Sequence, residues 1–195
     1  EPVDDIAGAG DGVVDQATFM ARRAALRANA ANPSVPLDNT YINWPAFRER
    51  YANAIGDTNR FSIDSAFSQL RSQGIDLLAN ITASPGRFPL AGDTDWANKW
   101  ELWQHYYAQG FYLSNSYAVQ RFSMFNEPNN WTGMTPGDWQ RRLSIASDAL
   151  QTAVIDVNAR FGKSLTARIF APNTANGSTV QHVCPGHGHS QRLHQ

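Results

Sequence analysis

The chain has 195 residues, which suits one domain, and 42% of them are hydrophobic, enough for a real core. Its formal net charge of −1 excludes a general electrostatic attraction to nucleic acid or to anionic membranes. No stretch approaches the roughly 20 apolar residues of a membrane span, so we expect neither nucleic acid nor a membrane among the partners. A start at Glu1 without a methionine fits a mature form after removal of a leader, or simply a boundary chosen within a longer chain. We expect a secreted or periplasmic protein.

Residues 1–60 are expected to form a helical N-terminal segment. Alanine and arginine, both good helix formers, predict a helix over residues 15–31. Prolines at positions 33 and 36 end it. Apolar residues spaced three and four apart then predict an amphipathic helix over residues 44–55.

From residue 62 onward, helical and strand patterns alternate. Helices are predicted over residues 62–74, 96–113 and 138–161, and strands over residues 75–82, 119–125 and 165–171. Strands separated by helices indicate an α/β fold in which successive crossovers make the strands parallel. Each strand is followed by a polar loop that contains proline or glycine.

Residues 178–195 form a histidine-rich tail without periodicity, which we expect to be flexible. Three histidines and the single cysteine of this region could bind a transition metal: His182, Cys184, His187 and His189. Their irregular spacing at a terminus favours no specific metal site, and we expect neither a metal nor a cofactor.

The segment from Arg121 to Trp131 carries the most specific motif, an apolar strand that ends on Asn126-Glu127-Pro128. Strand alternation places Phe125, Ser123 and Arg121 on the same face as Glu127. The other face carries Asn126, Met124 and Phe122. Its apolar side chains suit packing against helices. For Asn126 to reach the site of Glu127, the strand must bulge or end there, and Pro128 favours an ending.

An Asn-Glu-Pro triplet at the C-terminal end of a strand resembles the acid/base motif of the clan-A glycoside hydrolases, which are (β/α)8 barrels. The resemblance implies a partial, truncated barrel of the TIM type over residues 61–177, with residues 119–125 as its fourth strand. It also implies that Glu127 is the proton donor and that Asn126 contacts the sugar 2-hydroxyl. The long aromatic helix followed by Phe-Asn-Glu-Pro-Asn looks most like the agarase and porphyranase group or the xylosidase and iduronidase-like group.

The same resemblance implies hydrolysis of β-glycosidic bonds in a polysaccharide or oligosaccharide with retention of configuration. Its nucleophile would be a glutamate after the seventh strand. The chain stops at Gln195, and no residue in it matches that glutamate.

Other residues after the strands are candidates for binding substrate. Trp131 could form a stacking wall for a sugar ring, although core packing is nearly as good an explanation. Asn80 and Asn173 end two other strands and would face the same rim, with turn formation as the alternative. The aromatic residues of helix 96–113 follow helical spacing, which favours a packing face.

A rival interpretation is a truncated barrel without glycosidase activity that binds carbohydrate or works as an oligomer. Three parallel strands would leave two open sheet edges, and unpaired edges invite pairing with another chain. We therefore expect self-association, most simply as a homodimer with two-fold symmetry.

Overall fold

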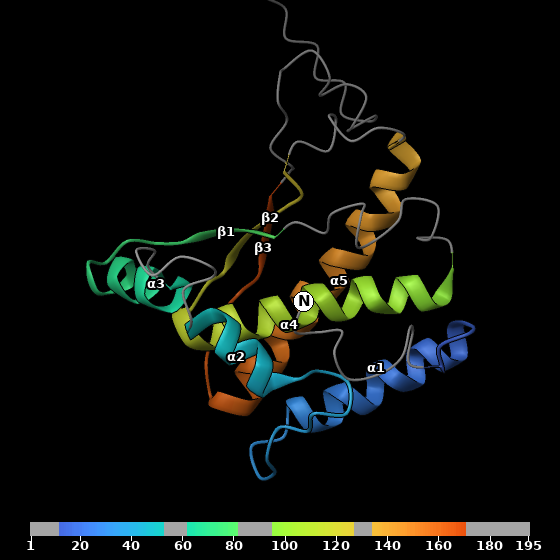
Figure 1. The fold of residues 1–195 in the computed structure, drawn as a ribbon, viewed down its shortest axis with the longest axis horizontal. Coiled ribbons are helices and arrows are strands. Elements are labelled where there is room, and N and C mark those ends of the chain that lie inside the picture. Colours follow the sequence, from blue (N-terminus) through green and yellow to red (C-terminus); the bar gives the residue numbers. More distant parts are fainter. Residues whose placement is uncertain (1–11, 53–61, 82–94, 127–133, 171–195) are drawn as a thin grey trace, which may run out of the picture.

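The computed structural model describes residues 12–52, 62–81, 95–126 and 134–170, and in them helices and strands alternate as predicted from residue 62 onward (Figure 1). The elements are α1 (Gln16–Ala30), α2 (Trp44–Ala52), α3 (Ile63–Ser72), β1 (Leu78–Ile81), α4 (Trp96–Tyr117), β2 (Arg121–Met124), α5 (Pro136–Phe161) and β3 (Arg168–Phe170). The two helices expected in the N-terminal segment are both present.

The strands form an open, all-parallel sheet in the order β1-β2-β3. In the register, Ala79 lies beside Phe122, and Phe122 beside Ile169. The α/β class and the parallel strands are therefore confirmed. The described residues contain three strands and no closed barrel, so the finer expectation of a partial barrel remains a proposal.

The helices begin at side chains that cap their free N–H groups. At α5, the Thr135 hydroxyl accepts a hydrogen bond from the Asp138 N–H, and the Asp138 carboxylate accepts one from the Thr135 N–H at 2.8 Å. These two residues form a capping box, with Pro136 in the first turn. Hydrogen bonds from Thr135 lower the pKa of Asp138 below its ordinary value. Asp15 and Thr18 form a second capping box at α1.

Helix α4 continues four residues beyond its predicted end at Leu113. In this added turn Ser114 is buried, and its hydroxyl donates to the Val119 carbonyl at 2.9 Å. Tyr117 is also buried and packs edge-on against Phe67 of α3. The C-cap after Tyr117 is Ala118, which adopts a left-handed conformation with φ of 55°.

The strand after α3 begins later than predicted, at Leu78 instead of Ile75. The Ile75 N–H bonds back to the Leu70 carbonyl at 3.0 Å, and the Gly74 N–H bonds to the Arg71 carbonyl at 3.0 Å. With Gly74 at φ of 76°, these two bonds make a Schellman motif at the end of α3. Ile75 is thereby part of the helix end and cannot pair in the sheet.

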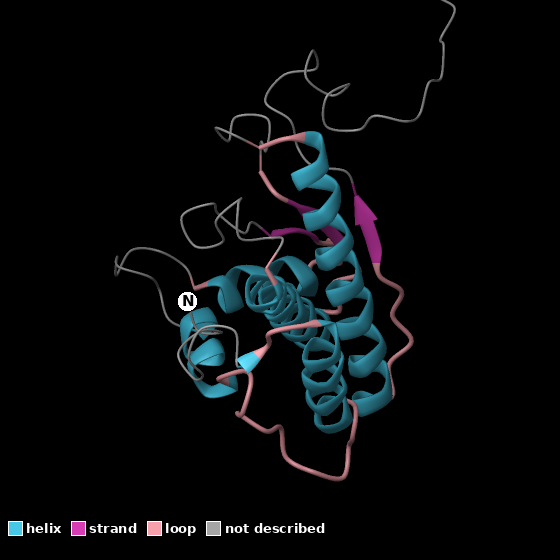
Figure 2. Cartoon of the chain, turned by 90° about the vertical axis from the view of Figure 1, so that its right-hand side faces the viewer, coloured by secondary structure: helices cyan, strands magenta, loops and turns pink. Residues whose placement is uncertain are grey.

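The two faces of the sheet differ in burial. Ala79, Ile81, Phe122 and Met124 are buried on the face against which α4 and α5 pack. On the other face, Leu78 of β1 is 54% exposed. Figure 2 shows the strands beside the crossing pair of long helices. A parallel sheet is normally covered on both faces. Among the described helices, α4 and α5 pack on the first face and leave the second one uncovered.

The aromatic residues of α4 form the centre of the core, as their spacing predicted. Trp100 and Trp103 stack with ring centroids 5.6 Å apart, and Trp103 stacks on Tyr107 at 4.8 Å. All three are buried. Gly110 lets α5 approach this helix closely, because a Cβ there would lie 2.9 Å from Leu150 Cδ2.

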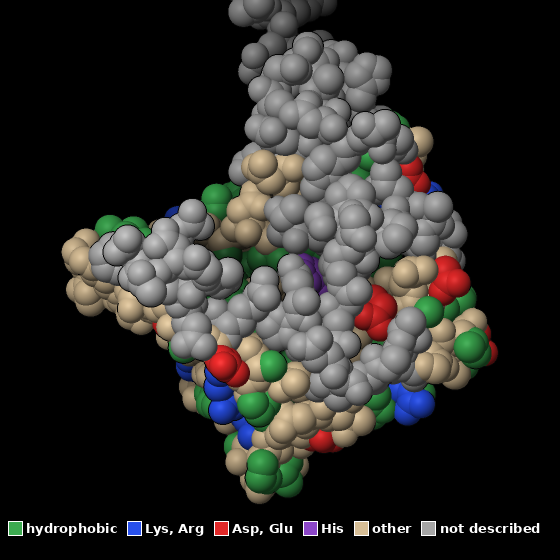
Figure 3. Space-filling view, viewed as in Figure 1, with side chains coloured by type: hydrophobic (Ala, Val, Ile, Leu, Met, Phe, Trp, Pro, Cys, Tyr) green, Lys and Arg blue, Asp and Glu red, His purple; other side chains and the backbone are tan. Residues whose placement is uncertain are grey.

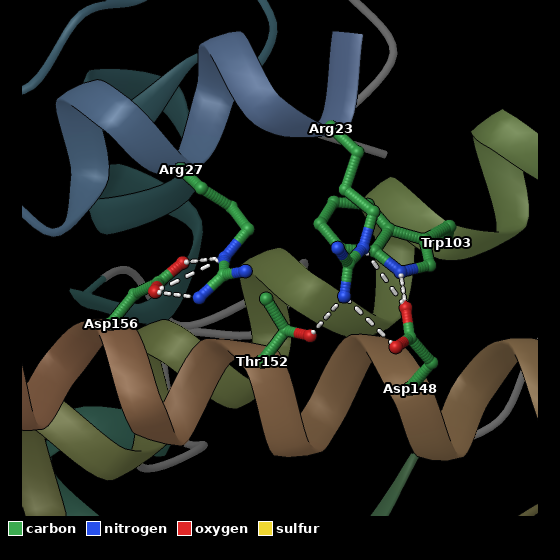
Figure 4. A network of polar contacts seen from close by, with 6 residues as sticks. All are labelled: Arg23, Arg27, Trp103, Asp148, Thr152 and Asp156. Atoms are coloured by element: carbon green, nitrogen blue, oxygen red, sulfur yellow. Dashed lines mark hydrogen bonds and ion pairs between the residues drawn. The ribbon is translucent and has the colours of Figure 1, made fainter. Parts of the chain in front are cut away.

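Helix α1 is attached to α5 by a polar network (Figure 4). Arg27 makes a two-pronged ion pair with Asp156, whose side chain is only 1% exposed. The Tyr107 hydroxyl also donates to Asp156, at 3.0 Å. Burial raises the pKa of Tyr107 well above its ordinary value, and the neighbouring Asp156 carboxylate adds to the effect. A second pair, Arg23 with Asp148, lies two helical turns away along α5.

The distribution of charge can be followed on one side of the molecule (Figure 3). On the side shown in Figure 3, acidic and basic side chains of the described residues are intermixed. In the part of the chain that the structure describes, no helix combines the length and the apolar character needed to cross a bilayer.

Candidate functional site at the sheet edge

The candidate site is the C-terminal end of the sheet, where all three parallel strands end. We call it the sheet edge, as distinct from the two outer strands. Because the strands are parallel, their last residues, Ile81, Met124 and Phe170, lie at the same edge of the sheet. Of the predicted site residues, Asn80 and Asn126 are described by the structure and contribute to this edge. The other three predicted residues, Glu127, Trp131 and Asn173, lie outside the described residues.

Asn80 belongs to the sheet face that the helices do not cover. Its side chain is exposed, and its register partner on β2 is Ser123. The Asn80 Nδ2 lies 3.5 Å from the Ser123 Oγ, a long contact at the limit of a hydrogen bond. Ser123 is buried even though it is on this face. The two side chains therefore place an amide and a hydroxyl side by side, one residue before the strand ends.

The strand alternation breaks at Phe125. Its φ of 63° is left-handed, a backbone conformation that is common for glycine and rare for a bulky residue. Its N–H still donates to the Ile81 carbonyl at 3.1 Å, so the backbone remains attached to β1. The predicted requirement that the strand bulge or end before Asn126 is met, because β2 ends at Met124.

The expectation that Phe125 shares the face of Ser123 is wrong. The Phe125 ring is fully buried between α4 and α5, 5.9 Å from the Tyr106 ring and 4.9 Å from the Trp139 ring. The left-handed backbone turns this side chain to the helix side, which buries it among aromatic rings. As a consequence Asn126, which strict alternation would place against the helices, is exposed at the edge of the sheet.

Tyr106 supports the same edge from beneath. It is fully buried on α4, and its hydroxyl donates to the Ile81 carbonyl at 3.2 Å. The Ile81 carbonyl thus accepts from both Tyr106 and the Phe125 N–H. These bonds hold the ends of β1 and β2 in one position relative to α4, which gives Asn80 and Asn126 a rigid base.

Sequence reasoning missed Ser123 and Tyr106 as parts of this edge. The signal for Ser123 was available, since it is a polar residue between the apolar Phe122 and Met124 of the strand. Tyr106 was interpreted as part of the helix packing face, and its hydroxyl contact with β1 depends on the crossing of α4 over the sheet.

Titratable groups with altered pKa lie elsewhere in the described structure. Burial raises the pKa of Asp64 on α3, which accepts a hydrogen bond from the Tyr112 hydroxyl at 3.2 Å. Within residues 12–52, 62–81, 95–126 and 134–170, no group of three His, Cys, Asp or Glu side chains could hold a metal ion. The histidine-rich tail lies outside these ranges.

Comparisons of the chain with protein-family models, with curated proteins and with solved structures found no match.

Proposed function

We propose that this chain contributes the acid/base side of a retaining β-glycosidase that acts on a polysaccharide, with Glu127 as the proton donor. The observation that carries the proposal is the position of Asn126. The left-handed turn at Phe125 exposes Asn126 at the C-terminal edge of a parallel sheet, directly before a glutamate and a proline. Strand ends of this kind are where parallel α/β enzymes hold their reactive groups.

The polar groups of the edge support the proposal. An amide such as Asn126 can both donate to and accept from a sugar hydroxyl. Asn80 adds a second exposed amide one strand away. In the reaction, Glu127 protonates the leaving oxygen and later takes a proton from the attacking water. Retention requires a second carboxylate about 5 Å from the first, and we assign no residue to that role.

The burial of the two sheet faces agrees with a partial barrel of the TIM type. In such a barrel the helices cover the outer face of the sheet, and the inner face points to the barrel axis. The face with Asn80 and Ser123 is the one that α4 and α5 leave uncovered, so it would line the interior. Under this proposal the substrate binds above that face, at the ends of the strands.

The proposal is tested by incubating the chain with a panel of β-linked polysaccharides and following the products by NMR. We expect the chain to bind at least one substrate. Where a second carboxylate completes the site, we expect cleavage in which the first sugar released keeps the β configuration. A product that appears first as the α anomer would show an inverting enzyme and contradict the two-step mechanism. Failure to cleave or bind any member of the panel would contradict the glycosidase proposal as a whole.

A second candidate is an oligomeric protein without glycosidase activity, and the exposed apolar side chains on the sheet favour it. Leu78 of β1 is 54% exposed and Phe170 of β3 is 43% exposed. Within the described residues, neither outer edge of the sheet is paired with a further strand. Exposed apolar groups next to unpaired strand edges are typical of surfaces that pair with another chain.

For this candidate we expect a homodimer that dissociates on dilution, as measured by sedimentation velocity across a concentration series. Leu78→Lys should shift the equilibrium toward monomer, because a charge would then be buried in the contact. Ile155→Lys serves as the control, because its side chain is 56% exposed and lies on helix α5 and not on a strand. A well-folded monomer at all concentrations would contradict the dimer.

A further inference from the structure

A cavity of about 380 Å³ lies between α1, α4 and α5. Its volume falls in the range of about 300–1,000 Å³ that is typical of small-molecule sites. Phe19, Trp96, Trp103 and Ile145 form an apolar floor, and polar side chains stand at the rim. None of its described lining residues belongs to a strand, so the cavity is separate from the sheet edge.

The floor is rigid and aromatic. The Phe19 ring lies 5.9 Å from the Trp96 ring and 6.3 Å from the Trp103 ring. Trp103 is buried, and its indole N–H already donates to Asp148 at 2.7 Å. The floor therefore offers aromatic surface, with the Trp103 donor already engaged. A flat apolar ring would bury its surface here without leaving a polar group unpaired.

The charges of the described residues at the rim leave an excess of one positive charge. Asp148 is neutralised by Arg23. The Arg23 Nε lies 3.1 Å from Asp148 Oδ2, and the Arg23 Nη2 lies 2.9 Å from Asp148 Oδ1. Arg141 is paired with Asp138 in the first turn of α5. Lys99 lies over the Trp96 ring, with its Nζ 4.1 Å from the ring centroid.

A ring contact does not neutralise an ammonium group. Among the described residues, no carboxylate forms an ion pair with Lys99. This lysine is half-buried at the margin of an apolar cavity, where an ion pair is screened less than on the open surface.

We propose that this cavity binds a small amphipathic monoanion, a flat ring that carries a carboxylate on a short chain. The ring lies on Trp96, Phe19 and Ile145, and the carboxylate meets the Lys99 ammonium. The charge balance selects one negative group, because Asp148 and Arg141 already have partners. This site rests on no part of the proposed glycosidase role.

The test is isothermal titration calorimetry of the whole chain with 3-phenylpropionate and with 3-phenylpropionamide, which has the same ring and no charge. We expect the acid to bind about tenfold more tightly than the amide, the factor that corresponds to one hydrogen bond to a charged group. Equal affinities for the two compounds, or no binding of the acid at about 1 mM, would overturn the proposal without any variant being needed.

Variants then locate the site. Lys99→Met keeps the apolar stem over Trp96, and it should weaken the acid about tenfold while leaving the amide unchanged. Lys163 is a half-buried lysine near the Phe161 ring, just beyond the C-terminal end of α5. Lys163→Met is the matched control and should bind both compounds as the parent does. Ser144→Phe places a ring into the cavity from an exposed position, so it should abolish binding of both. Unaltered binding by Ser144→Phe would place the ligand elsewhere and overturn the assignment.

Discussion

Replacement of Glu127 by glutamine is expected to lower the rate of polysaccharide cleavage by about 10²–10⁴-fold, the contribution of one positioned acid/base group. The amide keeps the size of the carboxyl group and cannot donate the proton that the leaving oxygen requires. Aryl glycosides with acidic leaving groups need less protonation, so we expect them to lose less activity. The comparison of the two substrate classes therefore separates loss of the acid from general damage to the site.

Glu49→Gln provides the matched control, because Glu49 is an exposed glutamate on α2. It should leave all rates unchanged. In a Glu127→Ala variant, added azide should restore turnover of the aryl glycoside and yield a β-glycosyl azide, since the small anion can replace the water that Glu127 activates. Turnover of the natural polysaccharide at the parent rate by Glu127→Gln would refute the assignment of this residue.

Replacement of Asp156 by asparagine is expected to cost about 3 kcal/mol of the free energy of unfolding, the low end of the range for breaking a buried ion pair. The substitution leaves the Arg27 guanidinium without its carboxylate and weakens the bond from the Tyr107 hydroxyl. We choose the low end because the Arg27 side chain is 33% exposed and can turn partly toward water. Urea unfolding followed by far-UV circular dichroism measures the change.

Asp148→Asn is the internal comparison for that experiment. Its side chain is 50% exposed, so the pair with Arg23 is screened by solvent and should contribute at most about 1 kcal/mol. We expect Asp156→Asn to destabilise the protein more than Asp148→Asn, although both ion pairs join the same two helices. Equal effects of the two substitutions would show that burial does not control the strength of this network.

Local signals in the sequence were enough to predict the secondary structure. The helices were found because helix-forming composition and apolar spacing act within a few positions. The capping residues Asp15, Ser62, Asp95 and Thr135 act over the same short range in the structure. The alternation of strands and helices then predicted that the strands run parallel, since a crossover helix brings the chain back to start the next strand in the same direction. Asn80 and Asn126 were placed at the strand ends for the same reason. The roles of Glu127, Trp131 and Asn173 stay predictions.

Contacts between distant segments decided the rest. Arg27 and Asp156 are 129 residues apart, and nothing near either residue indicates its partner. The turn at Phe125 has the same origin: strand alternation favours one face for its ring, and the aromatic contacts with Tyr106 and Trp139 favour the other. Burial of a large ring outweighs the cost of about 1–3 kcal/mol for a left-handed backbone. The exposure of Asn126 therefore depends on where α4 and α5 pack, which no local pattern of the sequence contains.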